Sequence, residues 1–436
     1  MGQHVEQNIC DKAERSQNKK TIVMACTHPY WSVLQVGSQH LARQFAKNGW
    51  DVHYISAPIT PLHLAGLLNF KNELAKRFKS AFNKPLIHEE GNIHSYIPFS
   101  LLAPAGCPLL RDRIVTHLWQ QTMIPTLKSL KNHISSHGID LLYIDNLSYH
   151  FLLDNFSYGK SIFRVMDIHE GFPGWKGKAR KLAVKITEKV DLTVYSAQSL
   201  KNYVDSLNPR KSAFIPNGVD NELFTKTDRA QQSYDNREKL SKVLPQNLLI
   251  SAEDDNPLIL KRKHRHPLLQ HIKNPIILYT GMIDSRLDIH LIRSAAQKLS
   301  GVTFVFSGII EHSKLLKDLP KNIYFTGPVD HKELPFLMKD AVAGIIPFDV
   351  KNRMSLIQGI RPLKLLEYMA AGLPVITAPW PELENMNSPA WIYNNEQDFI
   401  DLVNKAVYTK KNNSKAKDYA AQNDWKHSYN LMLNAL

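Results

Sequence analysis

The chain has 436 residues, a length that favours two folded domains. Hydrophobic residues make up 43% of the sequence and charged residues 22%, which is ordinary for a globular protein and excludes a wholly disordered chain. The 54 lysines and arginines outnumber the 40 aspartates and glutamates, giving a formal net charge of +14. Such an excess favours a polyanionic neighbour: nucleic acid, an anionic membrane surface or a phosphate-rich ligand.

The cysteines and the first residues of the chain bear on its compartment. Cys10, Cys26 and Cys107 are odd in number and have no metal-binding spacing, so neither a disulfide framework nor a structural zinc site is expected. Residues 1–20 are polar, which predicts a disordered tail rather than a secretory signal. No stretch approaches the roughly 18 to 20 apolar residues that cross a bilayer. We therefore expect a location in the reducing cytoplasm.

The first half of the chain alternates between strand and helix patterns. A β-branched run at 21–28, a helical pattern at 38–49 and a strand at 51–56 predict the βαβ unit that opens a doubly wound sheet. Further short apolar runs predict strands at 140–146, 161–167, 191–196 and 212–216. We assign residues 21–224 to one N-terminal Rossmann-like domain.

The second half repeats this rhythm after an interruption. Residues 225–273 are polar and contain a basic cluster at 261–266, which indicates a linker or insert with little packed core. Runs that predict strands then follow at 275–282, 302–308, 323–328, 344–348 and 373–377. We expect a second Rossmann-like domain over 274–410 and a C-terminal helix over 411–436 that packs back on the first domain. A cleft between two such domains would be the natural ligand site.

The stretch GIRPLKLLEYMAAGLPVIT (359–377) is the most informative in the sequence. Pro362 suits the first turn of a helix, and Gly372 suits the left-handed residue that ends one. Lys364 and Glu367 are three residues apart, so they share one helical face. A helix N-terminus attracts phosphate, Lys364 adds a full positive charge there, and Glu367 can accept hydrogen bonds from ribose hydroxyls one turn further on. An exposed Lys–Glu pair is the plain alternative.

The surrounding motifs resemble those of the GT-B glycosyltransferases, as found in bacterial polysaccharide biosynthesis. The matching segments occur in the family's order and are PNGVD (216–220), YTGMIDSRLD (279–288), GPVDHKELPFLMKDA (327–341), IIPF (345–348) and PLKLLEYMAAGLPVI (362–376). The resemblance implies an α/β fold of two Rossmann-like domains facing across a cleft. It also implies transfer of a sugar from a nucleotide-diphosphate sugar, with UDP as the first candidate nucleotide, to a glycan.

The resemblance also assigns the donor site to the C-terminal domain. It implies that Glu367 binds the ribose, Lys364 the diphosphate, and the backbone near Val329 the base. Arg286 is a candidate for a second phosphate-binding cation, with an ordinary surface arginine as the alternative. No metal and no resident cofactor are expected, because in this fold cationic groups and a helix end neutralise the leaving diphosphate.

One departure from the family concerns stereochemistry. Many retaining members carry a second glutamate eight positions before the ribose-binding one, and that position here is Gly359. An inverting reaction is therefore favoured, which needs a general base on the acceptor hydroxyl. A retaining GT-B enzyme or a nucleotide-sugar epimerase is the alternative.

Asp167 is the first candidate for this base. It closes the predicted strand 161–167, and the carboxyl end of a parallel strand borders the ligand crevice. Its placement resembles that of the aspartate base in xanthan-type glucuronosyltransferases, whereas the plain alternative is an aspartate that caps a turn. His169 and Glu170 are rivals, and His28, in the loop after the first strand, could orient the acceptor.

Several basic segments lie in the predicted N-terminal domain. Residues 69–84 combine an aromatic stripe with lysines and an arginine, 95–110 reads as an acceptor-side loop, and 174–189 contains six cations. Such patterns suit either an anionic bilayer or helices with a solvated face. We expect an anionic membrane surface and a lipid-diphosphate-linked glycan as partners, and a peripheral position at the inner face of the cytoplasmic membrane. A nucleic-acid-binding protein is a remote alternative, because no recognisable nucleic-acid module is present.

Overall fold

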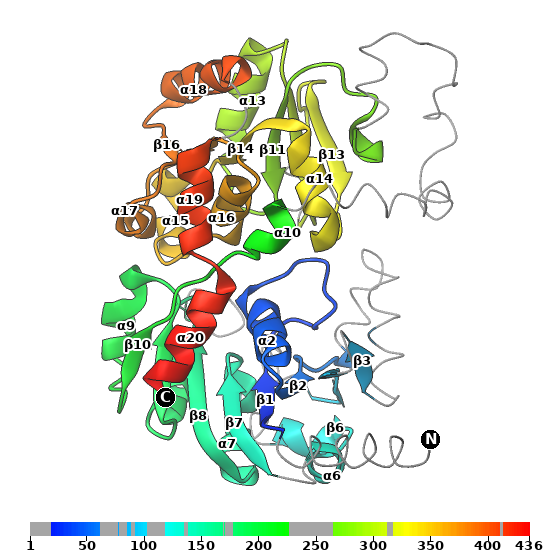
Figure 1. Cartoon of the computed structure of the whole chain (residues 1–436), viewed down its shortest axis with the longest axis vertical. Helices are drawn as coiled ribbons and strands as arrows, with labels where there is room; N and C mark the ends of the chain where they lie inside the picture. Colours follow the sequence, from blue (N-terminus) through cyan, green and yellow to red (C-terminus); the bar gives the residue numbers. More distant parts are fainter. Residues whose placement is uncertain are drawn as a thin grey trace, which may run out of the picture. The chain divides into compact units, whose positions relative to one another are not determined.

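The computed structural model describes residues 19–61, 77, 85–88, 92–102, 118–134, 138–168, 170, 178–225, 265–311, 317–409 and 413–436. The chain divides into two units (Figure 1). The first unit comprises the described residues up to Ser32, Val36–Pro216 and Ser428–Leu436. The second comprises Val33–Gln35 and Asn217–His427.

The first unit is built on an eight-stranded sheet in the order β10-β9-β8-β7-β1-β2-β4-β3. Neighbouring strands are parallel except for the antiparallel pair β3–β4. The strands are β1 Thr21–Ala25, β2 Asp51–Ile55, β3 Leu86–His88, β4 Ile93–Tyr96, β7 Ile139–Ile144, β8 Tyr158–Val165, β9 Leu192–Tyr195 and β10 Ser212–Phe214. Counted outward from β1, this is the order of a doubly wound sheet. All five residues of β1 are buried, as expected for a central strand covered on both faces.

Helices and a small hairpin complete the first unit. The helices and 3₁₀ turns are α2 Gly37–Lys47, η2 Trp119–Thr122, α6 Leu127–Ile134, η3 Leu147–Phe151, α7 Leu152–Asn155, α8 Ala179–Thr187, η6 Gln198–Leu200, α9 Lys201–Asp205 and most of α20 Trp425–Ala435. The hairpin pairs β5 Phe99–Ser100 with β6 Met123–Ile124. Tyr429 of α20 meets the ring of Phe45 on α2 at 5.0 Å and accepts a hydrogen bond from the Trp50 indole at 3.2 Å. The end of the chain thus packs on a helix formed by its beginning.

The second unit has an all-parallel sheet in the order β13-β12-β11-β14-β15-β16. The strands are β11 Ile276–Thr280, β12 Thr303–Ser307, β13 Ile323–Gly327, β14 Ala341–Ile346, β15 Val375–Thr377 and β16 Trp391–Ile392. The helices and turns are α10 Asn221–Thr225, η9 Pro267–Leu269, α13 Ile289–Lys298, η11 His331–Glu333, α14 Leu334–Lys339, α15 Val350–Ile357, α16 Leu363–Ala370, α17 Pro381–Met386, α18 Glu396–Tyr408 and α19 Ser414–Gln422. In chain order the strands read 3-2-1-4-5-6, the Rossmann arrangement.

Close packing fixes α16 against this sheet. A Cβ added at Gly344 in β14 would lie 2.3 Å from the ring of Tyr368, so only glycine leaves room for that ring. The hydroxyl of Tyr368 accepts hydrogen bonds from the backbone N–H of Thr280 at 2.7 Å and from its side chain at 3.1 Å. Helix α16 is therefore attached both to β14 and to the carboxyl end of β11.

The structure refines the predicted organisation. The division between the units falls at Pro216 and Asn217 rather than after residue 224, because α10 packs in the second unit. Of the predicted linker 225–273, residues 226–264 lie outside the described residues, but Leu269 and Ile272 are buried in the second core, so the linker prediction is wrong for 265–273. Helix α19 also belongs to the second unit.

The basic segments are described only in part. Most of 69–84 and of the tail 1–20 lies outside the described residues. The start of 95–110 is ordered as the end of β4 and as β5, which corrects the prediction of a simple loop. In 174–189, helix α8 buries one apolar face in the first core, with Ala179, Ala183 and Ile186 buried there.

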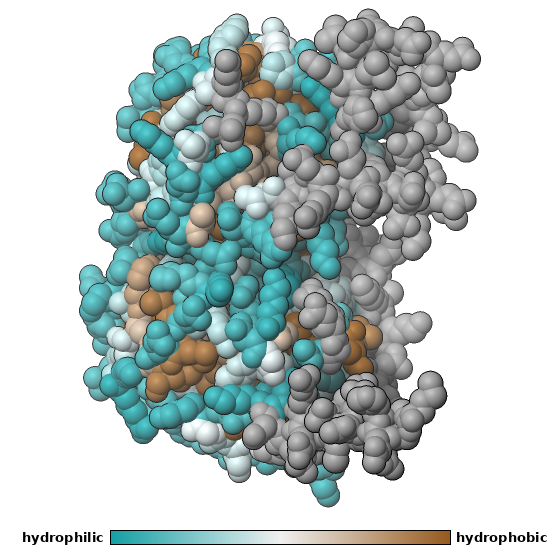
Figure 2. All heavy atoms as spheres, viewed as in Figure 1, coloured by the Kyte–Doolittle hydropathy of each residue, from teal (hydrophilic) through white to brown (hydrophobic). Residues whose placement is uncertain are grey.

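Hydrophilic residues predominate on the face seen in Figure 2, and its apolar residues form small separate patches. Among the described residues, no helix is both long enough and apolar enough to span a bilayer.

Candidate functional site

The centre of the second sheet is the natural ligand position in that unit. Strands β11 and β14 are neighbours, and the connections run in opposite directions from them, towards β12 on one side and β15 on the other. In open α/β sheets, ligands bind outside the carboxyl ends of the strands at such a switch point. The loops after β11 and β14 and the N-terminus of α16 border this ligand position.

Helix α16 begins and ends close to where the sequence predicts. Pro362 has an extended backbone (ψ 129°) and occupies the position just before the helix, which starts at Leu363; the prediction placed it one residue too far inside. Gly372 has φ +75°, the left-handed conformation predicted for the helix end. Free N–H groups and the helix dipole make the N-terminus of α16 attractive to an anion.

Lys364 lies at this end of the helix, above the end of β11. Its Nζ atom is 3.9 Å from the ring centroid of Tyr279 and would be 2.8 Å from a Cβ at Gly281, where φ is +120°. Burial, reinforced by the positive charge of Arg286, lowers the pKa of Lys364 to about 7. The surroundings of Lys364 thus disfavour its charged ammonium form. A bound anion would favour that form and raise the pKa again.

Arg286 lies nearby, in the loop between β11 and α13. Its Nε donates to both carboxylate oxygens of Asp284 at 3.0 Å, and Asp284 is buried. Through space, the charges of Arg286, Asp284 and Glu367 all act on Lys364. The structure therefore gathers Arg286, Lys364 and Glu367 in one region, with Arg286 held in place by a neighbouring acid.

Glu367, one turn along α16, is 6% exposed. The Nε2 atom of His331 lies 2.8 Å from its Oε1 atom. His331 opens η11, after the end of β13, and is itself buried. A buried carboxylate requires partners, and His331 supplies one of them. The sequence predicts Glu367 as a site residue but gives no reason to select His331, because its partner is 36 positions away.

Val329 lies in the same region of the fold. It occupies the loop between β13 and η11, two residues before His331, and is 8% exposed. The structure thus brings the predicted base-contacting loop to the strand end next to Glu367. Contact between the backbone near Val329 and the base of a nucleotide stays a prediction.

The approach to α16 is anchored by a buried ion pair that sequence reasoning also missed. Arg361 NH1 lies 3.3 Å from Glu382 Oε1 on α17, and its NH2 donates to Asn423 at 3.1 Å. The Asn217 side chain donates to the backbone oxygen of Arg361 at 2.9 Å, and the Trp380 indole donates to that of Ile360. These contacts fix the backbone just before the N-terminus of α16.

In the first unit, His28 and Asp167 follow two parallel strands, β1 and β8, which are separated by β7. His28 comes after β1, is exposed, and lies at the carboxyl edge of the sheet, as Asp167 does after β8. Asp167 is half-buried. The Oε2 atom of Glu170 accepts a hydrogen bond from Tyr203 at 2.8 Å, and its Oε1 atom is 3.9 Å from Arg180. His169 lies outside the described residues.

A buried acid that the sequence analysis did not single out lies at the same edge. Asp145 follows β7 and is 2% exposed. It accepts hydrogen bonds from the backbone N–H of Thr27, at 3.0 Å, and from the Ser38 hydroxyl on α2. Burial raises the pKa of Asp145, against the opposing effect of the Ser38 hydrogen bond. Asp145 thereby ties the loop that carries His28 to the end of β7.

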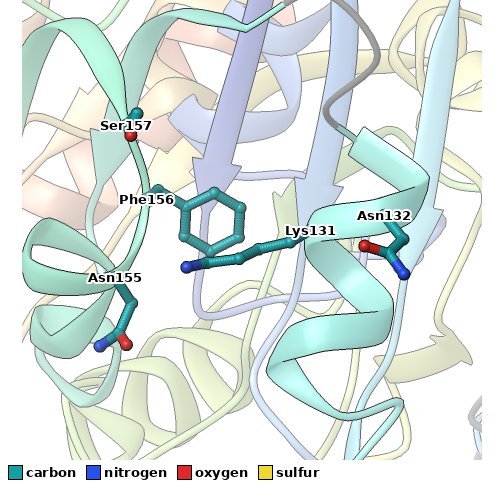
Figure 3. A pocket seen from close by; sticks show the side chains of 5 residues that line it. All are labelled: Lys131, Asn132, Asn155, Phe156 and Ser157. Carbon is teal, nitrogen blue, oxygen red and sulfur yellow. The ribbon is translucent and has the colours of Figure 1, made fainter.

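A pocket of about 200 Å³ lies elsewhere in the first unit (Figure 3). It is lined by Lys131, Asn132, Asn155, Phe156 and Ser157, with the Lys131 ammonium 5.7 Å from the Phe156 ring centroid. Ser157 directly precedes β8, so the pocket is at the amino ends of the strands, opposite the edge of Asp167. None of the predicted site residues lines it.

Comparisons with known proteins identify what part of the sequence is similar to. Residues 274–407 match the family described as Glycosyl transferases group 1. Over 151 residues the chain is 31% identical to the "Putative teichuronic acid biosynthesis glycosyltransferase TuaH" of Bacillus subtilis (strain 168), a match that spans 32% of this chain and 36% of that relative.

Solved structures match nearly the whole chain at low identity. A glycosyltransferase from Rickettsia africae ESF-5 has 14% identity and a TM-score of 0.54, covering 96% of this chain and 97% of its own. Anabaena Alr3699/HepE in complex with UDP-glucose has 12% identity and a TM-score of 0.56, covering 95% and 100%. An α,α-trehalose-phosphate synthase (UDP-forming) from Burkholderia vietnamiensis has 10% identity and a TM-score of 0.58, covering 96% of each chain. At such identities the likeness shows the fold. It confirms the predicted fold class, the GT-B fold of two Rossmann-like units, over nearly the whole chain. Within that fold, residues 274–407 are similar to the glycosyl transferases of group 1, the family that the sequence motifs predict.

Proposed function

We propose that the chain transfers a sugar from a nucleotide-diphosphate sugar, with UDP as the nucleotide, to a growing polysaccharide. The observation that carries this proposal is the pair Lys364 and Glu367 on α16, within the matched family segment and beside the switch point of the second sheet. The lysine suits a diphosphate and the glutamate a ribose. The UDP named in the complexes of structural neighbours supports the choice of nucleotide.

In this proposal the donor lies along α16. Its diphosphate meets the helix N-terminus and the Lys364 ammonium, with Arg286 as a second cation, and its ribose hydroxyls donate to Glu367. The backbone near Val329 contacts the base. As the glycosidic bond breaks, negative charge grows on the leaving diphosphate, and fixed cations stabilise that charge without reorganising. The reaction is proposed to need no metal.

On the acceptor side, Asp167 is proposed as the general base of an inverting displacement. It would take the proton of the acceptor hydroxyl while the oxygen attacks the anomeric carbon from the face opposite the diphosphate. Its position after a parallel strand and its half-buried state support this role. Glu170, three residues further along the chain, is the second choice, and His28 would orient the acceptor.

The acceptor is proposed to be a lipid-linked glycan at the inner face of the cytoplasmic membrane. The net charge of +14 supports an anionic surface as a partner. The name of the relative TuaH, which refers to teichuronic acid biosynthesis, supports polysaccharide synthesis as the setting.

Nucleotide binding tests the donor site directly. Glu367→Ala is expected to weaken UDP binding by about 1 to 3 kcal/mol, the range for a hydrogen bond to a charged group. Isothermal titration calorimetry of the wild type, this variant and the control Glu384→Ala, an exposed glutamate on α17, measures the effect. Equal UDP affinities for all three proteins would remove Glu367 from the site.

A further inference from the structure

We propose that His331 is a positioning residue, which orients the Glu367 carboxylate to receive the hydroxyls of a nucleotide's ribose. This inference rests on the proposed function, because it assigns a role to a neighbour of the proposed ribose-binding group. The two side chains come from different parts of the second unit. His331 follows β13, whereas Glu367 lies in α16, and they meet at 2.8 Å between Nε2 and Oε1.

The contact is buried and directional. The side chain of His331 is 10% exposed and that of Glu367 is 8% exposed. An imidazole N–H that donates to Oε1 restricts rotation of the carboxylate about its terminal bond, so the oxygens keep fixed directions. Among the described residues, Oε2 accepts no hydrogen bond. One oxygen is thus anchored while the other remains available to a ligand hydroxyl.

His331 is held in turn by its own surroundings. The ring of Phe224 on α10 meets the imidazole nearly edge-on, with centroids 5.7 Å apart and planes at 78°. The preceding residue, Asp330, accepts two hydrogen bonds. Its side chain accepts one from the backbone N–H of Lys332 at 2.9 Å, and its backbone oxygen accepts one from the backbone N–H of Glu333 at 2.8 Å. These contacts fix the turn from which His331 projects. Such support favours binding, because a side chain that is already fixed loses less conformational entropy when the ligand binds.

Two readings of His331 make different predictions. If it only fills space against Phe224, an aromatic ring without an N–H should serve, and any loss should affect all nucleotides alike. If it orients Glu367, the loss should appear with nucleotides that carry ribose hydroxyls and vanish with a nucleotide that lacks them. The probes are UDP and 2′,3′-dideoxyuridine diphosphate, which share base and diphosphate.

The experiment measures the affinity of both probes for the full chain and for three variants. His331→Phe keeps a ring against Phe224 but has no donor, and is expected to weaken UDP binding about tenfold while leaving dideoxy-UDP binding unchanged. His331→Gln, whose amide nitrogen can take the place of Nε2, is expected to recover part of the loss. His331→Asn, with a shorter amide, replaces the phenylalanine variant if that protein fails to fold, as judged by thermal unfolding.

Each outcome decides between the readings. A tenfold loss confined to UDP, with recovery in His331→Gln, supports the positioning role. Unchanged UDP affinity, or equal losses for UDP and dideoxy-UDP, overturns it. If the wild-type chain binds both probes equally, Glu367 does not bind ribose and the inference fails while nucleotide binding stands. If the wild type binds neither probe, the proposed function fails as well.

Discussion

At the scale of single residues, the proposed role of Lys364 predicts that nucleotide binding depends on pH. Its pKa is lowered to about 7 by burial and by Arg286, and a bound diphosphate would raise it again. Below pH 7 the free protein already carries the charge, whereas above pH 7 a proton must be taken up on binding.

UDP affinity is therefore expected to fall as pH rises from 7 to 9, by at most about tenfold per pH unit. Calorimetry across this range measures it, and proton uptake can be read from buffers of different ionisation enthalpy. Lys364→Arg, which stays charged, should lack the dependence. Affinity of the wild type that stays constant from pH 7 to 9 would contradict the assignment.

Asp167 carries a second prediction at this scale. Asp167→Asn keeps the size of the side chain but removes its basicity, so turnover should fall by about 10² to 10⁴, the usual contribution of a general base. UDP affinity should stay near that of the wild type, because the donor residues belong to the other unit. NMR of the product should show inversion at the anomeric carbon.

The matched control for Asp167 is Asp205→Asn on α9, an exposed aspartate of the same unit that pairs with Lys201. A product with retained configuration would contradict the inverting mechanism. Near-normal turnover of Asp167→Asn would move the role to Glu170.

Site residues differed in how far the sequence could predict them. Lys364 and Glu367 are visible because both lie in one helix, where spacing alone places them on one face. His331, Asp145 and Arg361 are not visible, since their partners lie 36, 107 and 21 positions away and meet them only through the fold. Sequence spacing reveals contacts within an element far better than contacts between elements.

At the scale of elements, the packing of α16 on β14 depends on Gly344. Gly344→Ala would place a Cβ 2.3 Å from the Tyr368 ring. Tyr368 and the strand neighbours of Gly344, Ala343 and Ile345, are all buried, so little space is available for the ring to move. We expect a loss of at least about 1 to 3 kcal/mol in the free energy of unfolding, the usual cost of overpacking. Urea denaturation measures it.

Gly301→Ala is the control for Gly344, because no atom lies within 4 Å of the Cβ it would add. Its stability should stay within about 0.5 kcal/mol of the wild type. Equal stabilities of the two variants would show that α16 can move away from β14 at little cost. UDP affinity of a folded Gly344→Ala protein should also fall, because the displaced helix carries Lys364 and Glu367.

Most strands were predictable and several boundaries were not. Short β-branched runs between turn residues mark the central strands of both sheets, since those strands are buried on both faces. The polar and basic average composition of residues 265–273 predicts a linker, although Leu269 and Ile272 are buried in the second core. Average composition does not show which two side chains are buried.

At the scale of the whole molecule, the positive charge predicts binding to anionic membranes. The chain should sediment with vesicles that contain anionic lipid at low salt, and less with neutral vesicles or at high salt, because exposed charges are screened. Phe78→Ser with Lys79→Glu, in the predicted amphipathic segment 69–84, should reduce the bound fraction of a folded protein. Equal sedimentation of wild type and double variant would leave that segment without a membrane role.

The central claim is that this chain transfers sugar from a donor held by Lys364 and Glu367. The most direct measurement is release of nucleoside diphosphate from a panel of nucleotide-diphosphate sugars, with and without a lipid-linked glycan extract, for the wild type, Glu367→Ala and Glu384→Ala. We predict acceptor-dependent release from at least one UDP-sugar, with Glu384→Ala similar to the wild type and Glu367→Ala about tenfold or more below it at subsaturating donor. No acceptor-dependent release from any donor, or equal rates for Glu367→Ala and the wild type, would contradict the account.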